Sequence, residues 1–151
     1  GNPTAPGCFC LLNNLLRKVI ESISKDFEII LIDCEAGLEQ INRKVIQSVG
    51  VVLIVSDMSL RSLETAHSIK EMAKKFTHYR HLGVILNKVK GNVDILLDKM
   101  EDLDLPLYGT IPEDQNIVDF EMEGKPLIKI PSTSISLEKI RQLVQKIIEL
   151  K

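Results

Sequence analysis

The most constraining feature of the sequence is an apolar run that ends in an acidic turn, Phe27-Glu28-Ile29-Ile30-Leu31-Ile32-Asp33-Cys34-Glu35-Ala36-Gly37. Four consecutive aliphatic residues, 29–32, can be buried on both faces, which is typical of a central strand in a parallel sheet covered by helices. Ligands of open α/β sheets bind at the carboxyl ends of the strands, where Asp33 would lie. A carboxylate there can hold Mg²⁺ through water, and Gly37 can let a loop approach a phosphate. Alternatively, Asp33 only ends the strand and caps the next turn.

The rest of the chain alternates apolar runs with amphipathic stretches. The runs predict further strands over about 49–55, 82–86 and 106–111. Apolar residues at helical spacing predict helices over about 11–24, 38–48, 60–76, 92–102 and 115–123, and from Ser134 or Ser136 onward. Ser59 is the expected N-cap of the helix that follows it. This alternation predicts a three-layer α/β fold, with a mostly parallel sheet and helices on both faces. The length of 151 residues predicts a single α/β domain over residues 1–151.

Composition and charge exclude several functional classes. The net charge is −2, from 19 basic and 21 acidic residues, which gives no electrostatic case for binding nucleic acid. No apolar run approaches the roughly 18 residues needed to span a bilayer. The polar opening, residues 1–6, does not resemble a signal peptide. The three cysteines do not form a disulfide framework, so we expect a cytoplasmic protein.

Each predicted strand ends in polar or turn residues: Asp33, Ser56-Asp57, Asn87-Lys88 and Pro112-Glu113-Asp114. Because the carboxyl ends of parallel strands meet at one edge of a sheet, these residues would line a continuous polar cleft. The Asn87 side chain offers both a donor and an acceptor, which matches the edge of an adenine. It can equally be an ordinary turn residue.

Several segments, taken together and in this order, resemble known motifs. Asp33-Cys34-Glu35-Ala36-Gly37-Leu38-Glu39 resembles the Walker B and switch II segment D-x-E-A-G-x-E of a subgroup of the MinD, ParA and nitrogenase iron-protein class of P-loop ATPases. Residues 57–66 are similar to the strand-to-helix turn of that subgroup. Asn87-Lys88-Val89 resembles its adenine-reading motif, and Ile111-Pro112-Glu113-Asp114 resembles the loop that wraps the base. Residues 8–17, which begin Cys8-Phe9-Cys10, resemble the C-x-C segment of the CooC-type ATPases, which assist nickel insertion into carbon monoxide dehydrogenase.

The resemblance implies a homodimeric ATPase that uses ATP or ADP with Mg²⁺ and loads a metal, with nickel expected, into a metalloenzyme client such as carbon monoxide dehydrogenase. Asp33 would hold the water shell of Mg²⁺, and Gly37 would sense the γ-phosphate. The residues implied at the nucleotide base are Asn87, Lys88, Pro112, Glu113 and Asp114.

The sequence departs from this class at its phosphate-binding elements. The class begins with a glycine-rich P-loop, K-G-G-x-G-K-[ST], and neither this motif nor switch I is found here. We therefore expect the C-terminal part of a larger ATPase domain, inactive in hydrolysis as this chain alone. In the class, the P-loop strand lies between the Walker B strand and the strand that follows it in sequence. Unpaired strand edges are costly in a dry core, so we expect residues 27–33 and 51–55 to pair directly, in parallel.

The cysteines indicate a metal site shared between two chains. Two thiolates from Cys8 and Cys10 cannot complete a tetrahedral site. Two copies related by a two-fold axis supply four sulfurs, which suit Zn²⁺, Ni²⁺ or another metal with soft ligands. The alternative is a pair of exposed, oxidisable thiols. Cys34, within the predicted strand, is expected to be a buried and inert thiol.

Two other functions remain open. The first is a MinD/ParA-like partitioning ATPase, in which the amphipathic helix over 137–151 would target a membrane surface, although its apolar face is more simply explained by core packing. The second is a non-catalytic, metal-binding dimerisation module.

Overall fold

The computed structural model describes residues 15, 18–20, 22–34 and 48–150. Its elements are the 3₁₀ turn η1 (Ser24–Asp26), β1 (Ser48–Ser56), α3 (Leu60–Phe76), β2 (His78–Val89), α4 (Asp94–Asp102), β3 (Leu107–Pro112), α5 (Gln115–Met122), the 3₁₀ turn η2 (Leu127–Lys129) and α6 (Ile135–Ile148). The alternation of strands and helices predicted from the sequence is confirmed over residues 48–150.

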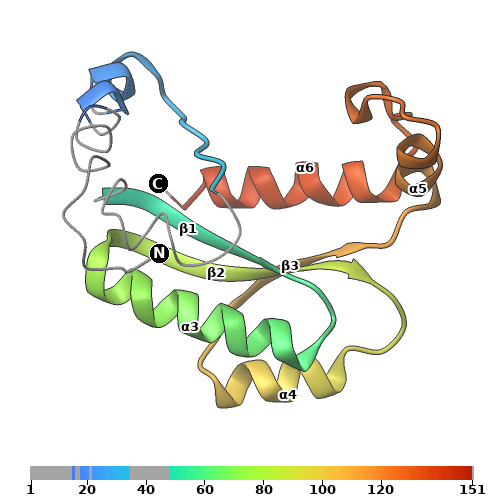
Figure 1. Ribbon diagram of the computed structural model, residues 1–151, viewed down its shortest axis with the longest axis horizontal. Coiled ribbons are helices and arrows are strands. Elements are labelled where there is room, and N and C mark those ends of the chain that lie inside the picture. The colour runs from blue at the N-terminus through green and yellow to red at the C-terminus, as the bar shows by residue number, and fades with distance from the viewer. Residues whose placement is uncertain (1–14, 16–17, 21, 35–47, 151) are drawn as a thin grey trace, which may run out of the picture.

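The described strands form one parallel sheet in the order β1-β2-β3. Ser48 of β1 pairs with His78 of β2, and Ser56 pairs with Leu86, so these two strands stay in register along their whole shared length. The register of β2 with β3 shifts between Leu86 and Val89. All three strands therefore run in one direction, and their carboxyl ends lie at the same edge of the sheet (Figure 1).

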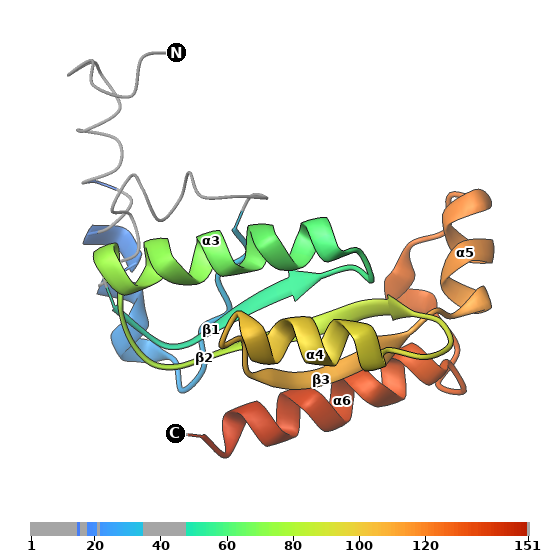
Figure 2. The same cartoon turned by 90° about the horizontal axis from the view of Figure 1, so that it is seen from below.

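Helices cover both faces of this sheet, as the sequence predicts. Figures 1 and 2 show α3 and α4 on one face and α6 on the other, while α5 lies beyond the carboxyl ends of the strands. The main core lies between the sheet and the first pair of helices. Its buried apolar members are Ile54, Leu63, Ala66, Ala73, Leu82, Val84, Leu86, Leu96, Met100 and Leu105.

Helix α3 begins where the sequence predicts, because Ser59 is its N-cap and its Oγ accepts a hydrogen bond from Ser62 N at 3.1 Å. The helix also buries a charged residue, Lys70, which is 5% exposed. Lys70 Nζ donates to the carbonyl of Asp104 and, at 2.6 Å, to its carboxylate. This ion pair connects α3 to the turn between α4 and β3, where Asp104 has a positive φ of 51°.

The predicted strand over 27–33 is wrong for this structure. Residues 27–34 are irregular, and the described ladder partner of β1 is β2, so the expected pairing of 27–33 with 51–55 is wrong as well. Leu31 is 88% exposed and Ile29 is 54% exposed. The physical reason is that an apolar run becomes a strand only when its backbone N–H and C=O groups find a neighbouring strand. Cys34 is consequently exposed, which corrects its expected burial.

Other boundaries agree with the predictions within a few residues, except that β2 begins four residues early, at His78. In the predicted helix 11–24, the described residues up to Ile23 are helical, and Ser24 begins η1. The predicted helix 38–48 lies outside the described residues, apart from Ser48, which begins β1. Within the described part of the chain, no helix has the length and apolar character of a membrane-crossing segment.

Candidate functional site

Three loops and the start of α6 meet at the carboxyl edge of the sheet. They are the turn after β1 (residues 56–59), the end of β2 with the following loop (87–93), the loop after β3 (112–114) and the N-terminus of α6 (134–136). The loops come from neighbouring strands, so the sheet register brings together residues that are far apart in sequence. This edge is where open α/β sheets bind ligands.

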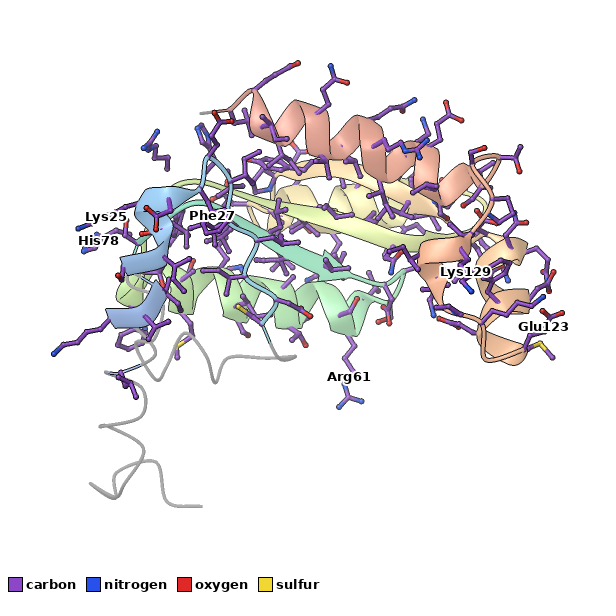
Figure 3. The ribbon with its side chains drawn as sticks, turned by 90° about the horizontal axis from the view of Figure 1, so that it is seen from above. Lys25, Phe27, Arg61, His78, Glu123 and Lys129 are labelled. Carbon is purple, nitrogen blue, oxygen red and sulfur yellow. The ribbon has the colours of Figure 1, made fainter. Side chains whose placement is uncertain are left out.

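The turn after β1 is held by its own polar side chains. Asp57 Oδ1 accepts a hydrogen bond from Ser59 N at 2.8 Å, and Ser62 Oγ donates to the Asp57 carbonyl at 3.1 Å. The hydroxyls of Ser56 and Ser62 are 2.6 Å apart. Hydrogen bonds from Ser59 and Ser62 lower the pKa of Asp57, because they stabilise its charged form. Arg61, on the next turn, extends away from the sheet (Figure 3).

The end of β2 carries a strained residue. Lys88 has a φ of +56°, in the left-handed region that residues with a Cβ rarely adopt. In this conformation Lys88 N donates to Asn87 Oδ1 at 3.0 Å. Asn87 is half-buried, and its Nδ2 has no hydrogen-bond acceptor among the described residues. The side chain therefore presents two free N–H donors at the carboxyl edge.

Contacts join the loop after β2 to its neighbours on both sides. Lys90 N lies 2.9 Å from Met58 Sδ, in the turn after β1. Lys90 Nζ forms an ion pair with the carboxylate of Glu113, in the loop after β3. Glu113 N also donates to the carbonyl of Val89 at 3.1 Å. The three loops thus form one hydrogen-bonded edge.

Asp114 is the most constrained residue of this edge, and it is 4% exposed. Its Oδ1 accepts hydrogen bonds from the backbone and side-chain nitrogens of Asn116, at 2.9 and 2.8 Å, which makes Asp114 the N-cap of α5. Its Oδ2 accepts from Ser134 Oγ at 2.5 Å and from Ser136 N at 3.1 Å. These donors, with Ser134 the strongest, lower the pKa of Asp114 from 3.8 to about 2.

The structure brings together the predicted residues at the ends of β2 and β3, which are Asn87, Lys88, Pro112, Glu113 and Asp114. It does not place Asp33 at the end of a strand; Asp33 is exposed in the irregular segment. Gly37, Cys8 and Cys10 lie outside the described residues. Across the part of the chain that is described, no group of three or more His, Cys, Asp or Glu side chains is placed to hold a metal ion.

The sequence did not predict the roles of Ser134 and Ser136, which are both fully buried. The sequence pattern marks them only as candidate first residues of the last helix. Their partner Asp114 is about 20 residues away, and no local periodicity connects the two segments. The pair of serines at the predicted helix start is itself a weak signal, because one serine can cap the helix while both donate to an acidic side chain elsewhere in the chain.

Comparison with known proteins relates the chain to nucleotide-binding domains. Residues 14–127 match the CobQ/CobB/MinD/ParA nucleotide binding domain. An uncharacterised ATP-binding protein of Methanocaldococcus jannaschii is 36% identical over 153 aligned positions, which cover 100% of this chain and 60% of that protein. The carbon monoxide dehydrogenase accessory protein CooC of Rhodospirillum rubrum is 35% identical over 131 positions, covering 82% of this chain and 47% of CooC.

A solved structure shows the same fold. The septum site-determining protein MinD of Pyrococcus horikoshii, complexed with Mg-ADP, superposes with a TM-score of 0.69 at 26% identity, covering 89% of this chain and 56% of that one. This chain thus spans about half to three fifths of the length of the proteins that it matches. The family match, which covers most of the chain, and the parallel sheet with its loops at the carboxyl edge show that the chain belongs to the CobQ/CobB/MinD/ParA nucleotide-binding domain family.

Proposed function

We propose that the carboxyl edge of this sheet binds the base of ATP or ADP, as part of a MinD/ParA-class ATPase. The observation that carries the proposal is the half-buried Asn87, which presents free N–H donors beside the loop 112–114. An amide donor can reach a ring nitrogen of a purine, and backbone groups of the neighbouring loop can complete recognition of the base. The Mg-ADP in the P. horikoshii relative supports this choice of ligand.

The residues present fit the base better than they fit the metal and phosphates. Asp33, which would hold the water shell of Mg²⁺, is a hard carboxylate ligand of the correct chemical type. It lies in an irregular, exposed segment, and Gly37 is outside the described residues. When bound, Mg²⁺ would neutralise phosphate charge during transfer. The chain's own described contribution is to bind and orient the base.

The finer proposal is a homodimeric, CooC-like ATPase that assists metal insertion, with nickel expected, into a metalloenzyme client such as carbon monoxide dehydrogenase. The similarity to CooC supports this proposal. Cys8 and Cys10 of two chains would hold the transported Zn²⁺ or Ni²⁺ as four thiolates, and nucleotide binding would close the dimer around it. The metal is the cargo in this scheme, not a resident cofactor.

A partitioning ATPase is the second candidate, because a MinD protein shares the fold. In that candidate function, α6 would target a membrane surface, and this role of α6 has less support. Leu143 of α6 is buried at 9% exposure, and a Cβ at Gly109 of β3 would lie 2.3 Å from it, so part of the apolar stripe already packs on the sheet. Ile140, Val144 and Ile148 remain 37–47% exposed.

Isothermal titration of the chain with ADP and with GDP, both with Mg²⁺, tests the base site. We expect ADP to bind more tightly than GDP. We expect Asn87→Ala to weaken ADP binding about five- to tenfold, since one hydrogen bond in a desolvated site is worth about 1–1.5 kcal/mol. Gln142→Ala is the matched control, because Gln142 carries an exposed amide in the middle of α6, where it pairs with Glu138 and Lys139. Equal ADP affinity in the two variants would contradict the site.

A further inference from the structure

The loop after β3 is attached to the start of α6 by buried polar contacts. A surface loop can satisfy its polar groups with water, so these contacts call for an explanation. Ser134 and Ser136 are fully buried, and Asp114 is nearly so. Buried polar groups of this kind are retained only when they are paired with one another. Here the pairing is complete: one carboxylate accepts four hydrogen bonds, two from Asn116 and two from the start of α6.

Each of the two serines does two things at once. Ser134 Oγ donates to Asp114 Oδ2 at 2.5 Å and accepts from Leu137 N at 3.1 Å, so it caps α6 while it holds the loop. Ser136 N donates to the same carboxylate oxygen, and Ser136 Oγ donates to the carbonyl of Pro112 at 2.8 Å. The loop 112–114 is therefore fixed at both ends of its short span by α6.

The opposite side of the loop faces the end of β2. Glu113 N donates to the Val89 carbonyl, and the Glu113 carboxylate pairs with Lys90. Asp114 itself has no acceptor capacity to spare for a ligand in this arrangement, since both of its oxygens already have two donors. Its effect on a ligand at this edge must come from where it holds the backbone of Pro112 and Glu113.

We infer that Ser134 and Ser136 are positioning residues for nucleotide recognition, which set the distance between the loop 112–114 and Asn87. The Ser134 hydroxyl acts through the buried carboxylate of Asp114, and the Ser136 hydroxyl acts through the carbonyl of Pro112. This inference rests on the proposed function of the edge as a purine-base site. Its consequence is that selectivity for the base depends on α6, which packs mainly on β3 and not on β2, the strand that carries Asn87. A ring bound between Asn87 and the loop tolerates little error in that distance, because hydrogen bonds weaken steeply with misalignment.

The test compares Ser134→Ala and Ser136→Ala with a control that loses stability elsewhere. Ala73→Gly is suitable, because Ala73 is fully buried near the C-terminus of α3, toward the amino-terminal end of the sheet. Calorimetry measures the ratio of ADP to GDP affinity in the intact chain. Amide hydrogen exchange over residues 112–117 measures how firmly the loop is held.

We expect both serine variants to lower the ADP to GDP affinity ratio about five- to tenfold. This is the effect of losing roughly one well-aligned hydrogen bond between the site and the base. Loop exchange should be faster in the same variants. Ala73→Gly should lower the melting temperature and leave the ratio unchanged. Ser134→Thr, which keeps the hydroxyl, should recover part of the ratio.

The experiment can refute the base site and the positioning role of the serines separately. If the unaltered chain binds neither ADP nor GDP, the base site is wrong, and the positioning role falls with it. If the unaltered chain prefers ADP and both serine variants keep that preference, only the positioning role is wrong. A ratio that falls equally in Ala73→Gly would also overturn it, because a general loss of stability would then explain the effect.

Discussion

Replacing Gly83 with alanine tests how closely β2 and β3 pack. Gly83 is buried in β2, and an added Cβ would lie 2.2 Å from Tyr108 Cδ1 and 2.5 Å from both Cε1 and Cγ. Non-bonded carbon atoms prefer separations of about 3.5–4.0 Å, so the ring or the strand must move by roughly 1 Å or more. The tyrosine ring is rigid and Tyr108 is half-buried, which limits how far the ring can move away.

The expected cost follows from two opposing terms. Overpacking of this kind costs about 1–3 kcal/mol. Replacing glycine with alanine restricts the unfolded chain and returns about 0.4–1 kcal/mol. The free energy of unfolding should therefore fall by about 1–2 kcal/mol, which corresponds to a melting temperature lower by roughly 2–8 °C for a chain of this size. Urea titration and thermal unfolding, both followed by circular dichroism, measure the two quantities.

Two further variants decide whether this reasoning is correct. Gly50→Ala in β1 is the matched control, because no atom lies within 4 Å of its added Cβ, and its stability should be unchanged or slightly higher. In a Tyr108→Ala background the ring is gone, so the cost of Gly83→Ala should disappear. If Gly83→Ala is as stable as Gly50→Ala, or if its cost survives the loss of the ring, the close packing of Tyr108 over Gly83 is refuted.

Three other predictions follow from the carboxyl edge and the N-terminal cysteines. Lys88→Gly should keep or raise the free energy of unfolding, by up to about 1 kcal/mol, because glycine adopts the positive φ without strain. Lys88→Val keeps a Cβ at this position, and a Lys88→Gly variant less stable than Lys88→Val would contradict the argument. The folded-state pKa of Asp114, about 2, is below its ordinary value of 3.8, so its contribution to stability is present above about pH 4 and is lost as the pH falls toward 2. Urea unfolding between pH 2 and 6 should show this loss, and Asp114→Asn should flatten it. Zn²⁺ or Ni²⁺ should convert monomers to dimers in analytical ultracentrifugation, and chelator or the double variant Cys8→Ser, Cys10→Ser should prevent it; equal masses with and without metal would exclude the shared site.

The parts of the fold that the sequence predicts are those with local signals. Ser59 before an apolar helical stripe marks the start of α3, because the capping residue and the periodicity lie within one short window. The periodicity alone predicts α5, and the structure adds Asp114 as its N-cap. Parallel pairing follows as well, because helical crossovers between consecutive strands leave few alternatives.

The parts that the sequence does not predict depend on partners. Residues 29–32 are apolar enough for a strand, yet a strand is defined by what it pairs with, and apolar content does not specify that partner. The same limit applies to the buried contacts of Asp114. Its capping of α5 is local and predictable, while its hydrogen bonds to Ser134 and Ser136 cross from one segment to another. Cys34 is exposed for the same reason, because residues 27–33 do not form the predicted strand.

The loops of the candidate site are connected to one another across strands, so their spacing is a property of the whole sheet. Met58 contacts Lys90, Lys90 pairs with Glu113, and the next residue, Asp114, is held by α6. A displacement of β3 against β2 must therefore change the separation of Asn87 and the loop 112–114. Gly83→Ala crowds the Tyr108 ring and so pushes on β3 from within the sheet, while no residue of the edge is substituted. It should lower the ADP to GDP affinity ratio, whereas Ala73→Gly, with a similar loss of stability, should not; equal ratios in the two variants would show that the edge is positioned independently of the sheet.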